Sequence, residues 1–359
     1  MYITKYFTNL CCRLLLVFLL PGSLYAVPLH IADTGTYALI PPPVTLKLLQ
    51  DFDSVRLRDN LLLIGKERNQ YSASANAHLE TVRKLILKSF SSGGMSSHTQ
   101  SFSVQNYQGM NIIGELYAKN RSTRGTLIIG AHYDTVEGSA GVDDNATGVA
   151  TLIELARILS HYDFKYNIRF VAFDLEEAVR NINGHGGTEG SKAFVEHGGI
   201  LNTDSIIGFI NLDMLGYYTS QKNSQQFPQG LKTVFPDLYK KVEKNEFRGD
   251  FLLSFSNDRS RSLARTVEES AHTYIPELSV INIPVPGNGE GMDDFRRSDH
   301  VHFWDNGYSA ISLGDGAYSR NPHYHSPEDK FQDINEHFLG MVTKLLLLTV
   351  ATQCEINIL

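Results

Sequence analysis

The chain has 359 residues, of which 42% are hydrophobic and 20% are charged, a composition that excludes a disordered or coiled-coil protein. Its 32 basic and 39 acidic side chains give a formal net charge of -7, so its overall charge offers no general attraction to nucleic acids or anionic membranes. Cys11 and Cys12 lie in a segment that we expect to be removed, which leaves Cys354 as a single thiol and predicts no internal disulfide.

The first 26 residues have the order of features that is typical of a secretory signal. Lys5 and Arg13 precede an apolar run at 14–20, and small and turn-forming residues then lead to Ala26. The apolar run is far shorter than the roughly 20 residues that a membrane-spanning helix needs. We therefore predict a signal peptide over residues 1–26, a mature chain without a membrane span, and export to the periplasm or the medium.

Three consecutive prolines at 41–43 mark a boundary after this segment. We interpret residues 27–49 as a leader and a candidate prosegment, and residues 50–359 as a single folded domain. Within that domain, residues 218–291 have weaker periodicity and several prolines and glycines, so we interpret them as an insertion at the rim of the fold.

Amphipathic segments and short apolar runs alternate along the domain. Apolar residues at helical spacing predict helices over residues 74–90, 148–159 and 335–354. Short apolar runs predict strands over residues 111–117, 126–131, 167–173, 206–212 and 310–313. This alternation favours an α/β fold, in which one domain has a mostly parallel, mixed central sheet flanked by helices on both faces.

Polar residues follow the predicted strands, and ligands of open α/β sheets bind beyond the carboxyl ends of the strands. After the strand at 126–131, His132 can coordinate a metal, and Asp134 can accept a hydrogen bond from the other imidazole nitrogen and orient the ring. Taken alone, the pair also fits a surface hydrogen bond. The next loop places Asp143 and Asp144 before a predicted helix, where acidic residues also act as helix caps.

Two further predicted strands end in carboxylates. Glu176 and Glu177 follow the strand at 167–173, and adjacent side chains of an extended backbone point in opposite directions. One of the pair can therefore bind a metal while the other faces a metal-bound water. Asp213 follows the apolar run at 206–212, and a buried Asp needs a partner. Because the fold brings these connections to one edge of the sheet, together they predict a metal site.

The order of these residues resembles the family of zinc-dependent exopeptidases that includes the bacterial secreted leucyl aminopeptidases and also contains the glutaminyl cyclases. The resemblance covers roughly residues 107–335. Its matching motifs are HYD at 132–134, DNATG at 144–148, EE at 176–177 followed by GS at 190–191, NLDM at 211–214 and YHSPED at 324–329. The stretch that begins with SDH at 298–300 is similar as well.

The resemblance implies two zinc ions bridged by Asp144, with His132 and Asp213 completing one site and Glu177 and His325 completing the other. Two such ions lower the pKa of a shared water and polarise the scissile carbonyl. Two imidazoles among the ligands favour zinc over magnesium.

The resemblance also implies the roles of the residues around the metals. Glu176 would be the general base, which takes the proton of the water and later delivers it to the departing amine. Asp134 would orient His132. A cis peptide bond is expected between Asp144 and Asn145.

These implications predict an exported, metal-dependent aminopeptidase whose catalytic domain spans residues 50–359 and whose substrates are peptides with a free N-terminus. A glutaminyl-peptide cyclotransferase is the main alternative, since the loop at 178–189 resembles that of the cyclases. Against it, Tyr324 stands where the animal cyclases place a tryptophan. A carboxypeptidase or dipeptidase could use the same metal centre. A non-catalytic binding ectodomain is disfavoured, because suitable residue types fill all five ligand positions and the position of the base. The sequence carries no signal for the oligomeric state.

Overall fold

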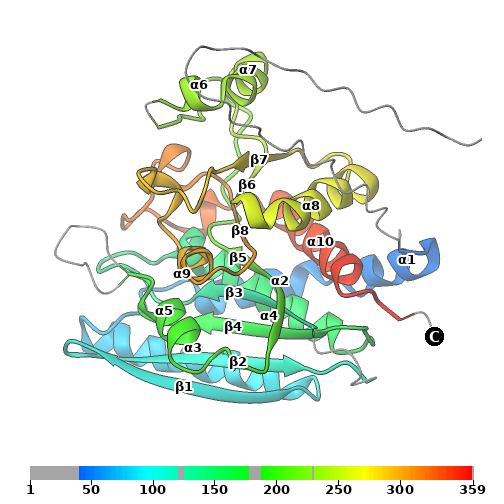
Figure 1. The fold of residues 1–359 in the computed structure, drawn as a ribbon. Coiled ribbons are helices and arrows are strands. Elements are labelled where there is room, and N and C mark those ends of the chain that lie inside the picture. Colours follow the sequence, from blue (N-terminus) through cyan, green and yellow to red (C-terminus); the bar gives the residue numbers. More distant parts are fainter. Residues whose placement is uncertain (1–39, 120–124, 178–186, 229, 358–359) are drawn as a thin grey trace, which may run out of the picture. The chain divides into compact units, whose positions relative to one another are not determined.

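The computed structural model describes residues 40–119, 125–177, 187–228 and 230–357 (Figure 1). The predicted signal peptide, most of the predicted leader and most of the loop at 178–189 lie outside these residues. Signal peptide, prosegment and export therefore stay predictions.

A mixed sheet of eight strands forms the centre of the fold, with the strand order β1-β2-β4-β3-β5-β8-β6-β7. The strands β4, β3, β5 and β8 are parallel neighbours, as are β6 and β7, whereas β1 with β2, β2 with β4 and β6 with β8 pair in antiparallel fashion. The strands are β1 (Ser96–Val104), β2 (Tyr107–Leu116), β3 (Gly125–His132), β4 (Asn167–Phe173), β5 (Ser205–Leu212), β6 (Leu252–Ser256), β7 (Val280–Pro284) and β8 (Ala310–Gly314). The predicted mixed, mostly parallel sheet is confirmed.

The five predicted strands correspond to β2, β3, β4, β5 and β8, but β1, β6 and β7 were not predicted. β1 is rich in serine and has no fully buried residue, so it lacks the apolar run that marks a strand. β6 and β7 lie within residues 218–291, which we interpreted as a rim insertion. The structure differs on this point, because β6 pairs with β8 and extends the central sheet.

Ten α-helices are present in the described residues. The predicted helices correspond to α3, α4 and α10, and side-chain caps mark the start of two of them. Ser72 accepts a hydrogen bond from the backbone N–H of Ala75, and Asn335 accepts one from that of Phe338. The helices are α1 (Pro42–Asp51), α2 (Ser54–Ile64), α3 (Ala73–Ser92), α4 (Gly148–Leu159), α5 (Glu189–Glu196), α6 (Leu231–Val234), α7 (Pro236–Lys244), α8 (Arg261–Tyr274), α9 (His300–Asp305) and α10 (Glu336–Gln353).

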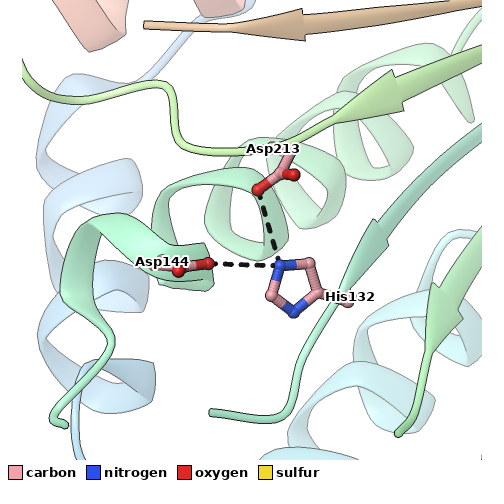
Figure 2. Close-up of side chains that lie close together, drawn as sticks. All are labelled: His132, Asp144 and Asp213. Atoms are coloured by element: carbon pink, nitrogen blue, oxygen red, sulfur yellow. Dashed lines mark ion pairs between the residues drawn. The ribbon is translucent and has the colours of Figure 1, made fainter. Parts of the chain in front are cut away.

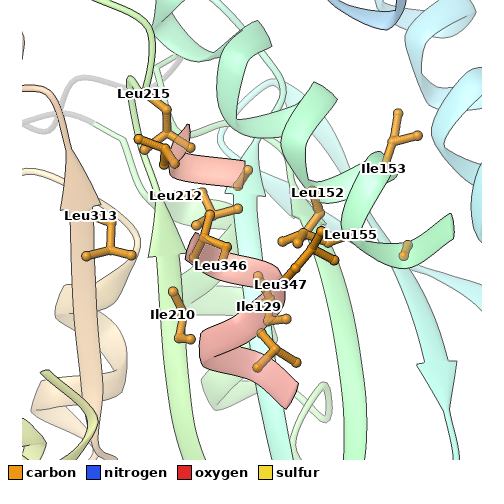
Figure 3. Close-up of a cluster of buried hydrophobic side chains, with 14 of the residues drawn as sticks. Ile129, Leu152, Ile153, Leu155, Ile210, Leu212, Leu215, Leu313, Leu346 and Leu347 are labelled. Atoms are coloured by element: carbon orange, nitrogen blue, oxygen red, sulfur yellow. The ribbon is translucent and has the colours of Figure 1, made fainter. Parts of the chain in front are cut away.

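Alternate residues of the strands enter two apolar layers, one on each face of the sheet. Leu127 and Ile129 of β3 belong to the layer that contains α2, α3, α4, α8 and α10. Ile128 belongs to the other layer, which contains α5 and α9. The predicted helices on both faces are thus confirmed. Figure 3 shows part of the first layer, where α4 and α10 contribute Leu152, Leu155, Leu346 and Leu347.

The helix α1 extends across the predicted boundary at residue 49. Leu48 is fully buried in the first apolar layer, and the backbone N–H of Ile40 donates to the Tyr274 hydroxyl of α8 at 2.9 Å. Residues 40–49 therefore pack on the folded domain. Of the helices that the structure describes, none has both the length and the apolar character needed to cross a membrane.

We expect Leu346→Ala to lower the free energy of unfolding by about 2–5 kcal/mol, because this fully buried side chain would leave a cavity between α10 and the sheet. The matched control is Leu63→Ala on α2, where Leu63 is 57% exposed and the expected cost is below about 0.5 kcal/mol. Denaturant unfolding followed by circular dichroism measures both. Equal losses in the two variants would contradict the packing described above.

Candidate metal centre

Most of the predicted site residues lie just beyond the carboxyl ends of neighbouring parallel strands. His132 is the last residue of β3, Glu176 and Glu177 follow β4, and Asp213 follows β5. β3 pairs in parallel with both β4 and β5, so the three strand ends meet at the same edge of the sheet. His325 lies in the connection between β8 and α10.

Asp144 lies between two clusters of possible ligands. Its Oδ1 is 3.3 Å from His132 Nε2, and its Oδ2 is 3.1 Å from His325 Nε2. His132 Nε2 is also 3.5 Å from Asp213 Oδ1, and His325 Nε2 is 2.9 Å from Glu177 Oε1. Figure 2 shows the first cluster, in which both carboxylates are directed toward the imidazole. In each cluster, one donor atom per residue lies within 4.8 Å of the others. The two clusters share Asp144 and contain the predicted ligand sets.

The loop that carries Asp144 is held from several sides. Asp144 lies within a short irregular helical segment, η1 (Val142–Thr147), which leads into α4. The Asp144–Asn145 peptide bond is cis, which confirms that prediction. The backbone N–H of Asp144 donates to Asp329 at 3.1 Å, and the Asn145 side-chain amide donates to the carbonyl of Leu212 at 2.8 Å. These contacts fix the loop against the end of β5.

Asp134 is buried behind the Glu pair. Its two oxygens accept hydrogen bonds from the backbone N–H groups of Glu176, at 3.0 Å, and Glu177, at 2.9 Å. Its Oδ1 lies 3.6 Å from His132 Nδ1, which is longer than a hydrogen bond. The carboxylate of Asp134 therefore holds the backbone of both glutamates and lies next to the imidazole. Its role in orienting His132 stays a prediction.

Burial and neighbouring charges set the protonation of the site. Burial raises the pKa of Glu177 to about 7, and the carboxylate of Asp144 adds to this shift. Burial also raises the pKa of Glu176 well above its ordinary range. Burial alone would lower the pKa of His325, but hydrogen bonds to Asp144 and Glu177 outweigh it and raise that pKa to about 10.

The donor set fits a metal such as zinc. Carboxylate oxygens and imidazole nitrogens are the ligands that zinc takes in catalytic sites, alongside thiolates. Buried carboxylates are normally paired or bind metals. For Asp144, Glu177 and Asp213, the ion-pair partners within 4.0 Å in the described part of the chain are imidazoles alone. His132 Nε2 lies between two carboxylates, as a metal-ligating nitrogen would.

A further buried carboxylate next to the site is that of Asp299, which precedes α9 and was not predicted as a site residue. It is fully buried, and within the described residues neither of its oxygens is hydrogen-bonded. Burial raises its pKa to about 7, and its charge contributes to the raised pKa of Glu176. In the sequence, only the SDH motif at 298–300 pointed to Asp299. The motif did not indicate which strand ends this residue would approach.

The two clusters open into a pocket of about 670 Å³, a size within the range of small-molecule and peptide sites. Tyr324 lies on the pocket wall and stacks on His325, with 3.7 Å between the ring centroids and 21° between the planes. The rest of the wall includes apolar residues of the sheet edge and its loops, namely Phe227, Leu253, Phe255 and Ile283.

Residues 111–350 match the model of peptidase family M28, a range that includes every predicted ligand and Glu176. The chain belongs to this family. It is 32% identical over 225 residues to YfbL of Escherichia coli, an uncharacterised protein, and 27% identical over 248 residues to the aminopeptidase YwaD of Bacillus subtilis. These alignments cover 60% and 68% of this chain, and 63% and 45% of the two relatives.

Solved structures share the fold. The LapA aminopeptidase of Legionella pneumophila aligns with a TM-score of 0.67 at 16% identity, over 93% of this chain and 80% of that one. A glutaminyl cyclase of Macrostomum lignano aligns with a TM-score of 0.65 at 17% identity, over 90% of this chain and 96% of that one. At these identities the likeness is one of fold, and it includes both kinds of enzyme that the sequence resembles.

We expect Asp134→Asn to weaken zinc binding by about 10–100-fold, because an amide nitrogen would face one of the two backbone N–H groups of the Glu pair and the charge beside His132 would be lost. The control is Asp258→Asn, which removes an exposed carboxylate paired with Arg261. Competition with a chromophoric chelator measures the affinity. The same affinity in both variants would argue against any support of the centre by Asp134.

Proposed function

We propose that this protein is a zinc-dependent aminopeptidase that releases N-terminal residues from peptides. The observation that carries the proposal is the pair of ligand clusters that share Asp144, with Glu176 beside them, in a chain of peptidase family M28. The aminopeptidase name of the Bacillus subtilis relative supports the same reaction class.

We propose that His132, Asp144 and Asp213 hold one zinc ion and that Asp144, Glu177 and His325 hold the second. When bound, zinc would activate a water and polarise the scissile carbonyl. The short distances from Asp144 to both imidazoles support its role as the residue that the two ions share.

Glu176 would act as the general base. Hydrolysis adds the hydroxyl of one water to the carbonyl carbon and breaks the C–N bond, and the remaining proton goes to the departing amine. Glu176 borders the pocket and is buried, a position from which its carboxylate can take up a proton and release it again within one cycle. The backbone hydrogen bond to Asp134 keeps it beside the ligands.

We also propose that the protein is exported to the periplasm or the medium. The support is the charged, apolar and small-residue order of residues 1–26. Peptides with a free N-terminus outside the cytoplasm would then be its substrates.

A glutaminyl-peptide cyclotransferase is the second candidate, favoured by the fold that the chain shares with almost the whole length of a glutaminyl cyclase. In that reaction the N-terminal amine attacks the side-chain amide of the same glutamine and releases ammonia. Tyr324, in place of a tryptophan, favours the aminopeptidase.

We expect Glu176→Gln to lower kcat for hydrolysis of leucyl p-nitroanilide by about 10²–10⁴-fold while zinc content is retained, since the amide cannot accept the proton. Chelation should abolish hydrolysis, and added zinc should restore it. The control is Glu269→Gln on α8, whose partly exposed side chain pairs with Arg265 outside the pocket. A parallel assay with a glutaminyl peptide distinguishes the candidates. Cyclisation without hydrolysis would favour the cyclotransferase, and neither reaction by zinc-loaded wild type would contradict both.

A further inference from the structure

Two arginines lie on the pocket wall, and among the described residues one of them has no ion-pair partner within 4.0 Å. Arg296 and Arg297 both lie on the pocket wall. Arg296 has an ion-pair partner, because its guanidinium donates to both oxygens of Asp305, at 3.1 and 2.7 Å. It also donates to the carbonyl of Asn288. Arg297 is exposed to the pocket and has no ion-pair partner within 4.0 Å among the described residues.

Two tyrosines hold the guanidinium of Arg297 in place. It lies 4.9 Å from the ring centroid of Tyr318, and its Nη2 donates to the Tyr324 hydroxyl in a long contact of 3.4 Å. The nearby carboxylate of Asp294 accepts a hydrogen bond from the Tyr318 hydroxyl at 2.6 Å, and its charge favours the charged form of Arg297 from beyond ion-pair distance. A guanidinium carries five N–H donors, so most of those on Arg297 remain available to a ligand in the pocket.

The position of Arg297 relative to the metal centre follows from Tyr324. The ring of Tyr324 stacks on the imidazole of His325, a predicted ligand, while its hydroxyl contacts Arg297 at the far end of the ring. The guanidinium therefore lies about one aromatic side chain away from the metal centre. One peptide residue spans roughly 3.3–3.8 Å, so a group one or two residues beyond the scissile carbonyl can reach it.

We infer that Arg297 binds a carboxylate of the peptide substrate, and that the preferred source is the C-terminal α-carboxylate of a di- or tripeptide. This inference rests on the proposed aminopeptidase function and names its substrate class. The planar guanidinium matches a carboxylate through two parallel hydrogen bonds. Every dipeptide presents such a carboxylate one residue beyond its scissile carbonyl, and every tripeptide two residues beyond it, whatever their side chains. A long peptide presents none there unless it has an acidic side chain.

The test compares four substrates that place the carboxylate differently. Leu-Gly has a free C-terminus, Leu-Gly amide has no carboxylate, and Leu-Glu amide and Glu-Gly amide carry one only on a side chain, after or before the scissile bond. For wild type we expect kcat/KM to be about ten- to a hundredfold higher for Leu-Gly than for Leu-Gly amide, a ratio that corresponds to one charge-assisted hydrogen-bonded pair.

Arg297→Gln should remove that preference, chiefly by raising KM for Leu-Gly, so that kcat/KM becomes similar for Leu-Gly and Leu-Gly amide. Arg297→Lys keeps the positive charge but lacks the two parallel N–H donors of a guanidinium, so it should restore part of the preference. The matched control is Arg58→Gln on α2, an exposed arginine outside the pocket that forms a 3.6 Å pair with Glu336. It should retain the full preference. An advantage of either side-chain acid over Leu-Gly would support carboxylate recognition and assign it to that side chain.

A binding measurement separates this inference from the proposed reaction. The probes are the analogue of Leu-Gly in which a CH₂–NH group replaces the peptide bond and the same analogue with an amidated C-terminus. By calorimetry, the acid should bind wild type at least about tenfold more tightly than the amide, and Arg297→Gln should bind both equally. Equal binding to wild type overturns the inference even if hydrolysis is seen. Tighter binding of the acid without any hydrolysis would support carboxylate recognition while contradicting the aminopeptidase.

Discussion

Asp144 places both of its carboxylate oxygens within 3.3 Å of imidazoles that come from distant parts of the chain. A buried carboxylate is costly unless a counter-charge or a metal compensates it, so both His132 and His325 must be held at this point. The surrounding loops serve this requirement, because Asp134 and Asp329 are themselves buried and accept hydrogen bonds from backbone N–H groups at or next to the predicted ligands. The site is therefore supported from behind by a second set of carboxylates.

The parallel strands in the middle of the sheet provide the rigid base for these loops. β4, β3 and β5 are neighbours whose alternate residues are buried in two apolar layers, so their carboxyl ends cannot shift independently. Loops of low regularity can then carry reactive groups in fixed positions. This arrangement explains how a chain that belongs to peptidase family M28 shares its fold with both aminopeptidases and a glutaminyl cyclase at low identity.

The pocket wall and the predicted ligands come from different parts of the chain. β6 and β7 extend the sheet beyond β8 and contribute Leu253 and Ile283, while the segment before α9 contributes Arg297. Leu253 and Ile283 belong to the apolar layer that contains α9, and they also line the pocket in which a substrate would bind. Substrate preference can change in this part of the chain without any change in the ligands, because no predicted ligand lies between residues 218 and 291.

The sequence by itself determined the elements whose signals are local. Apolar periodicity identified β4 and α4 at their observed bounds, and the polar residues that follow the strands pointed to side chains that the structure brings together. Resemblance to a family added the cis bond after Asp144, which the residues alone do not indicate. Only the tertiary structure decided the remainder. β1 has no strong apolar run and depends on pairing with β2, and β6 and β7 depend on pairing with each other and with β8. Asp299 and Arg297 are polar residues of a loop whose surroundings come from other segments of the chain, such as Tyr318 and Tyr324 beside Arg297. Such residues carry no local pattern, because their environment is created by strands and helices elsewhere in the chain.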